Sequence, residues 1–179
     1  MCSEVWVSRG AKDEVTALCP SASSAQDPLP LIERICERFH RVARQLHLRH
    51  EDRPTLDVTD EYDVQDLLHA LLRLFFDDVR SEEWTPSYAG GASRMDFLLK
   101  QEQTVIEVKK TRKGLTDREL GSQLLEDIAR YKEHPACRTL VCLVYDPEGR
   151  VANPRGFEND LSHVHDGLRV RVIISPRGS

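Results

Sequence analysis

The chain has 179 residues, of which 40% are hydrophobic and 31% are charged, and its formal net charge is -5. This composition is typical of a soluble globular protein with one core-bearing domain and an appendage. No apolar run reaches transmembrane length, the polar start lacks a signal-peptide pattern, and the five cysteines form no C-x-x-C pair. We therefore expect a cytoplasmic protein with reduced cysteines and no membrane contact.

The first part of the chain is expected to lie outside the main domain, which we place at residues 55–179. Residues 1–30 include a stretch rich in small residues and proline, which predicts a variable or partly disordered segment. Residues 31–54 follow, with a helix expected at 31–49 that carries an apolar stripe and a row of arginines, Arg34, Arg38, Arg41 and Arg44. This helix could grip the DNA backbone or dock on the core or on a second subunit, and we favour docking.

A second helix is expected to begin near Thr59 or Asp60, because apolar positions recur at helical spacing from Val64 to Val79. Glu61 and Gln65 are one turn apart and share a face near its N-terminal end, so they could reach a common site. An equally good interpretation is that Glu61 only complements the helix dipole.

Two short strands are expected next. Residues 93–99 alternate so that Asp96 lies on the face opposite Met95, Phe97 and Leu99. Residues 104–110 form the second strand and carry Glu107. Because residues 100–103 are too few for a crossover helix, the strands should pair antiparallel and bring Asp96 opposite Glu107.

Two carboxylates about 4 Å apart repel by about 4 kcal/mol at an effective dielectric of about 20, so they need a cation between them. An all-oxygen site suits Mg2+, or Mn2+ as a substitute. Lys109 shares the strand face of Glu107 and could orient a water or stabilise developing charge, which indicates phosphodiester hydrolysis. Taken alone, the same strand is also typical of an amphipathic edge strand with its charges in water.

The negative net charge is unusual for a DNA-binding protein, but the local distribution of charge matters more. A basic run leaves the second strand and would meet phosphates that pass over the metal site; a solvated loop is an equally good interpretation. The candidate contacts to nucleic acid are Arg94, Lys110, Arg112, Lys113 and Arg155, the last in a loop where a surface role is commoner.

Three further elements complete the expected fold. Residues 116–134 predict a helix with Gln123 at the edge of its apolar stripe, residues 139–145 predict a strand buried on both faces, and residues 168–174 predict a last strand. The fold class is therefore α/β, with a central mixed sheet flanked by helices on both faces.

The set Glu61, Asp96, Glu107, Lys109 and Gln123 resembles the PD-(D/E)XK, or restriction-endonuclease-like, nuclease superfamily over residues 55–175. The resemblance implies a core of αβββαβ order. One departure is that Ser93-Arg94-Met95 stands where the proline of the motif would be. Gln123 resembles the polar residue that faces the metal or the DNA backbone.

By this resemblance, Asp96 and Glu107 are metal ligands and Lys109 is the catalytic lysine. The carbonyl of Val108 would add a ligand, and Glu61 would complete the site for a second ion.

The function implied is a Mg2+-dependent nuclease that hydrolyses DNA, of a bacterial restriction or defence type, with RNA not excluded as a substrate. A homodimer or a larger defence complex is the expected assembly. The alternative is a catalytically silent or partner-activated nucleic-acid-binding module with the same fold. A third interpretation, a structural oligomerisation protein, predicts no salt-dependent affinity for DNA.

Overall fold

The computed structural model describes residues 27–81 and 94–177, so nearly all of the predicted segment 1–30, together with Ser93, lies outside the described residues. Along the chain the elements are α1 (Leu29–His47), the short 3-10 helix η1 (His50–Asp52), α2 (Glu61–Leu72), β1 (Val79–Ser81), β2 (Phe97–Leu99), β3 (Thr104–Lys110), α3 (Asp117–Lys132), β4 (Thr139–Tyr145), α4 (Pro154–Leu161), β5 (Val164–His165) and β6 (Leu168–Ser175).

The strands form one mixed sheet in the order β1-β2-β3-β4-β6-β5. Strands β3, β4 and β6 are parallel to one another, and the outer strands pair antiparallel. From α2 to β4 the elements follow the predicted αβββαβ order, and the α/β fold class is confirmed. No helix within the described ranges is long and apolar enough to cross a membrane.

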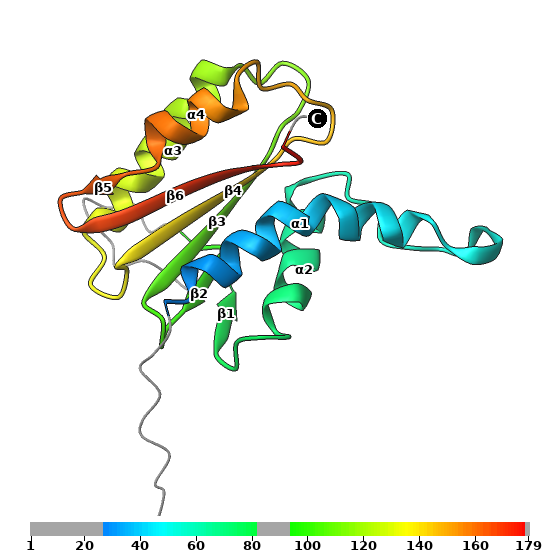
Figure 1. Cartoon of the computed structure of the whole chain (residues 1–179), viewed down its shortest axis with the longest axis horizontal. Coiled ribbons are helices and arrows are strands. Elements are labelled where there is room, and N and C mark those ends of the chain that lie inside the picture. Colours follow the sequence, from blue (N-terminus) through cyan, green and yellow to red (C-terminus); the bar gives the residue numbers. More distant parts are fainter. Residues whose placement is uncertain (1–26, 82–93, 178–179) are drawn as a thin grey trace, which may run out of the picture.

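Helices cover both faces of this sheet (Figure 1). One hydrophobic core lies between the sheet and the pair α1 and α2, and the other lies between the sheet and the pair α3 and α4. Alternation along β3 divides its side chains between them, with Ile106 and Val108 in the first core and Val105 in the second. Strand β4 is buried from Leu140 to Tyr145, which explains its nearly continuous apolar sequence.

Helix α2 is shorter than predicted. It starts at a capping box in which the Asp60 side chain accepts from the backbone N–H of Asp63 (3.0 Å) and the Asp63 side chain accepts from the backbone N–H of Asp60 (3.1 Å). The expected continuation to Val79 is wrong because the chain turns after Leu72 to form β1. Val79 therefore lies in a strand, and Phe75 is 56% exposed.

Strand β2 is also shorter than predicted, and Asp96 lies in a bend just before it. This bend interrupts the alternation of the strand. Met95 therefore packs with Leu98 in the core under α3, whereas Phe97 and Leu99 lie in the core under α1 and α2. The expectation that Met95 shares a face with Phe97 and Leu99 is wrong for this reason.

Helix α1 packs on β6 and α2 through a stripe of buried side chains, Leu29, Ile32, Ile35, Cys36, Phe39 and Ala43. Two of its acidic side chains pair with arginines in or just after β6. Arg171 Nε, in the strand, lies 2.6 Å from Glu33, and Arg177 Nη1, two residues beyond it, lies 3.0 Å from Glu37. Arg34, Arg38, Arg41 and Arg44 are exposed, on the side of α1 that faces away from the buried stripe. The division of the chain at residues 30 and 54 stays a prediction.

Candidate active site

The β2–β3 hairpin brings Asp96 and Glu107 together. Phe97 of β2 is paired with Ile106 of β3. The residue before Phe97, Asp96, therefore lies beside the residue after Ile106, Glu107. The backbone N–H of Asp96 lies 3.4 Å from Glu107 Oε1. Asp96 Oδ2 accepts from the backbone N–H of Val108 at 2.7 Å, which fixes the Asp96 carboxylate against β3.

The first turns of α2 are tied to this hairpin by two hydrogen bonds. Gln65 Nε2 donates to Asp96 Oδ1 at 2.8 Å, and the backbone N–H of Lys110 donates to Glu61 Oε2 at 3.1 Å. Glu61 and Gln65, which helical spacing predicted to share a face, therefore both contact the hairpin. Glu61 does more than complement the helix dipole, because its carboxylate holds the end of β3.

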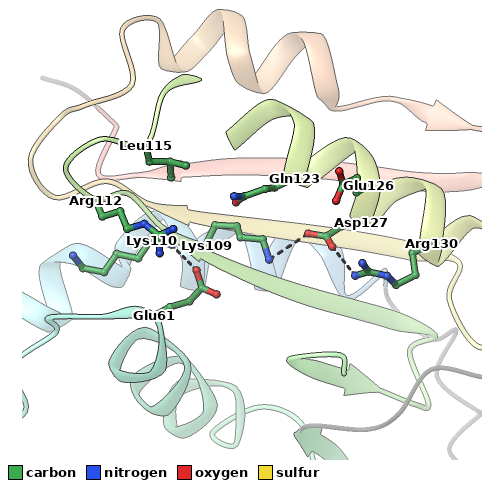
Figure 2. Close-up of a pocket in the computed structure, with 9 residues that line it drawn as sticks. All are labelled: Glu61, Lys109, Lys110, Arg112, Leu115, Gln123, Glu126, Asp127 and Arg130. Atoms are coloured by element: carbon green, nitrogen blue, oxygen red, sulfur yellow. Dashed lines mark hydrogen bonds and ion pairs between the residues drawn. The ribbon is translucent and has the colours of Figure 1, made fainter. Parts of the chain in front are cut away.

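Helix α3 supplies contacts that the sequence reading missed. Lys109 Nζ lies 3.3 Å from Asp127 Oδ2 and 3.6 Å from Glu107 Oε2. Arg130 Nη1 donates to Asp127 Oδ1 at 2.8 Å, and the Tyr131 hydroxyl donates to Glu107 Oε1. Figure 2 shows the Lys109 side chain extending toward Asp127. The sequence held one signal for this contact, because helical spacing places Asp127 on the apolar stripe of α3. In the structure Asp127 is indeed only 5% exposed.

Burial and charge set the protonation of these groups. Burial raises the pKa of Asp96 above its usual range, and burial together with repulsion by Asp96 raises the pKa of Glu107. Burial lowers the pKa of Lys109, but the surrounding carboxylates, Asp127 first, outweigh it and the net pKa is raised. Lys109 is therefore a charged hydrogen-bond donor at neutral pH.

Two hollows open at the site and share a wall made by Glu61 and Arg112. The lysine pocket, of about 350 Å³, is shown in Figure 2 and is lined by Glu61, Lys109, Lys110, Arg112, Leu115, Gln123, Glu126, Asp127 and Arg130. The tyrosine pocket, of about 420 Å³, is lined by Asp60, Glu61, Tyr62, Gln65, Arg94, Met95, Asp96 and Arg112.

Most of the predicted nucleic-acid contacts lie around these pockets. Lys110 and Arg112 line the lysine pocket, and Arg94 lines the tyrosine pocket with Arg112. Lys113 is exposed in the turn after β3 and Arg155 is exposed on α4, and neither lines these two pockets.

The donor set suits a hard cation. Asp96 and Glu107 are adjacent carboxylates whose pKa values are raised chiefly by burial, and a divalent cation between them would stabilise their ionised forms. Within residues 27–81 and 94–177, no group of three or more acidic, histidine or cysteine side chains is gathered as a metal cluster. Two carboxylates are nevertheless enough for Mg2+, which usually keeps several waters and binds substrate phosphates.

The sequence matches the family model described as REase_DpnII-MboI over residues 30–177. The chain belongs to the DpnII-MboI family of restriction endonucleases. The match begins in α1 and extends beyond β6, so it includes both helical layers and the whole sheet. Membership in the DpnII-MboI family confirms the resemblance to restriction-endonuclease-like nucleases. No curated protein and no solved structure gives a significant match to the chain.

Proposed function

We propose that this member of the DpnII-MboI family is a Mg2+-dependent endonuclease that hydrolyses phosphodiester bonds in DNA, with Mn2+ as a substitute ion, in bacterial restriction or defence. The observation that carries the proposal is the juxtaposition of Asp96, Glu107 and Lys109. The half-buried Asp96 carboxylate and the buried Glu107 carboxylate, both with raised pKa values, lie beside a charged lysine. They are next to a polar pocket lined by both basic and acidic side chains.

Asp96 and Glu107 would hold the ion, with oxygen ligands added by the Val108 carbonyl and, for a second ion, by Glu61. When bound, Mg2+ would polarise a phosphoryl oxygen and lower the pKa of a coordinated water. The role of the chain is to hold these oxygens in place. Gln65 and the Val108 N–H fix Asp96, and the Tyr131 hydroxyl fixes Glu107.

Lys109 would act as a hydrogen-bond donor. Burial lowers the pKa of Lys109, but the neighbouring carboxylates, Asp127 first, outweigh this effect and favour the protonated ammonium group. This group can orient the attacking water and stabilise the negative charge that develops on the phosphate. Gln123, on the wall of the lysine pocket, would add a neutral polar contact.

The DNA backbone would cross the basic wall of the two pockets. Lys110, Arg112 and Arg94 would contact phosphates there, with Lys113 reaching the backbone from its exposed turn. Arg155, exposed on α4, stays a prediction for a more distant contact. Since cutting both strands of a duplex calls for two active sites, we propose a homodimer, or a larger defence complex, as the working assembly.

The test is cleavage of supercoiled plasmid, linear duplex, single-stranded DNA and RNA with Mg2+, Mn2+ or EDTA, by the wild type and by Asp96→Ala. We expect metal-dependent cutting of DNA that EDTA and Asp96→Ala both abolish. Intact nucleic acid in every reaction, with salt-sensitive DNA binding retained, would contradict hydrolysis and favour the binding-module alternative. RNA cleavage without DNA cleavage would overturn the substrate assignment.

A further inference from the structure

Tyr62 is an exposed aromatic residue at the mouth of the tyrosine pocket. It follows Glu61 in the first turn of α2, and 71% of its surface is exposed. An aromatic side chain stabilises a fold in proportion to the apolar area it buries, so Tyr62 contributes little to this core. The ring instead stands beside the groups proposed to bind the metal and the DNA backbone.

The carboxylates that line the tyrosine pocket are already engaged by other groups of the chain. Asp60 accepts from the backbone N–H of Asp63 at 3.0 Å, Glu61 accepts from Lys110, and Asp96 accepts from Gln65 and Val108. The pocket therefore combines hydrogen-bonded carboxylates with two guanidinium groups, those of Arg94 and Arg112, and an exposed aromatic face. Phosphate and a nucleobase are the two chemical groups that such a lining complements.

The size and place of the tyrosine pocket agree with a nucleotide. Its volume of about 420 Å³ falls within the range of small-molecule sites. It shares Arg112 and Glu61 with the lysine pocket, where the scissile phosphate would lie next to Lys109. A nucleotide in the tyrosine pocket would thus be a neighbour of the cleaved bond.

We propose that the tyrosine pocket binds the nucleotide next to the scissile phosphodiester, with the Tyr62 ring stacked on its base and Arg94 and Arg112 at its phosphates. This proposal rests on the proposed nuclease function and assigns a subsite within it. Stacking on an aromatic ring tolerates any base, so Tyr62 would hold the strand without reading its sequence. Such stacking requires a base that is free of its neighbours, either in a single strand or turned out of the duplex stack.

The test is binding of a fluorescein-labelled single-stranded oligonucleotide, whose bases are free to stack, in EDTA, followed by fluorescence anisotropy at several salt concentrations. Tyr62→Ala should bind about tenfold more weakly at every salt concentration, because stacking does not release counterions. Arg112→Ala should instead reduce the slope of log Kd against log salt by about 0.7, as expected for one lost phosphate contact on a single strand. Tyr62→Phe keeps the ring and should recover most of the affinity that Tyr62→Ala loses.

Leu74→Ala is the matched control, because Leu74 has the same exposed fraction of 71% and lies beyond the other end of α2. It should bind as the wild type does. Wild-type affinity in Tyr62→Ala, or an equal loss in Tyr62→Phe, would overturn the stacking role. If the wild type cleaves DNA while Tyr62→Ala binds and cleaves equally well, the proposed subsite is wrong and the nuclease function stands. A wild type that neither binds nor cleaves DNA would contradict both the subsite and the nuclease function.

Discussion

Lys109 Nζ lies 3.3 Å from Asp127 Oδ2, nearer than the 3.6 Å that separates it from Glu107 Oε2. The ammonium group of the proposed catalytic lysine is thus held by a carboxylate from α3 as well as by its own strand. Arg130 in turn binds Asp127 at 2.8 Å. The geometry makes Asp127 a positioning residue that acts through Lys109.

Asp127→Asn should therefore slow cleavage more than it weakens binding. A misplaced donor in the active site costs on the order of 10²-fold in rate. We expect single-turnover cleavage to slow by about 10- to 100-fold. DNA affinity should not fall, because the substitution removes a negative charge from the lining of the lysine pocket. Glu133→Gln, at the exposed end of α3, is the control and should keep the wild-type rate. An unchanged rate in Asp127→Asn would contradict the positioning role.

Tyr131→Phe should destabilise the protein, because the Tyr131 hydroxyl donates to the buried Glu107 carboxyl. Loss of a donor to a buried polar group costs about 1–3 kcal/mol in the free energy of unfolding, which urea denaturation measures. Tyr62→Phe removes a hydroxyl from an exposed ring and should leave the unfolding free energy unchanged. Equal stability of Tyr131→Phe and the wild type would show that the hydroxyl is dispensable.

The Asp63 capping interaction gives a prediction with a defined pH dependence. Hydrogen bonds from Thr59 and Asp60 lower the pKa of Asp63, so the ionised form stabilises the folded state. This stabilisation is complete above the usual Asp pKa of about 3.9 and is lost as the pH falls through the lowered pKa.

Asp63→Ala should accordingly cost about 1 kcal/mol in unfolding free energy at pH 7, the usual net contribution of a hydrogen bond. The difference from wild type should stay constant from pH 7 to about pH 5 and shrink only below the usual Asp pKa of about 3.9. Asp66→Ala, at an exposed position of the same helix, is the control. A difference that already shrinks near neutral pH would show that Asp63 is not the group responsible.

Removal of the metal should be visible without any cleavage. An ion that binds only the folded state raises the melting temperature, so Mg2+ should raise Tm relative to EDTA. Asp96→Asn replaces one of the two proposed ligands and should remove this rise, whereas Asp117→Asn, at the start of α3, should retain it. A wild-type Tm that is identical with Mg2+ and with EDTA would argue against the proposed ion.

Local spacing explains why the hairpin and its residues could be predicted. The short polar connection at residues 100–103 allows only an antiparallel pair, and the period of two along β3 places Glu107 and Lys109 on one face. The positions of Glu61 and Gln65 followed in the same way from the helical repeat of α2. These features depend on neighbours that are close in the sequence.

The features that escaped prediction depend on tertiary contacts. Asp127 occupies a position that helical periodicity assigns to the core, and only the approach of Lys109 from β3 explains a carboxylate there. The bend at Asp96, which turns Met95 into the opposite core, is imposed by the hydrogen bonds from Val108 and Gln65. Likewise, apolar spacing alone did not reveal that α2 ends at Leu72, because the exposed Phe75 continues the pattern.

The most direct test of the central claim is single-turnover cleavage of supercoiled plasmid in Mg2+ by the wild type, Lys109→Ala and Lys132→Ala. Lys132 is an exposed lysine at the end of α3 and serves as the matched control. Loss of a preorganised charged donor costs about 10²- to 10³-fold in rate, so Lys109→Ala should fall by that factor while Lys132→Ala cuts as the wild type does. A Lys109→Ala variant that cleaves at the wild-type rate would contradict the account of this site.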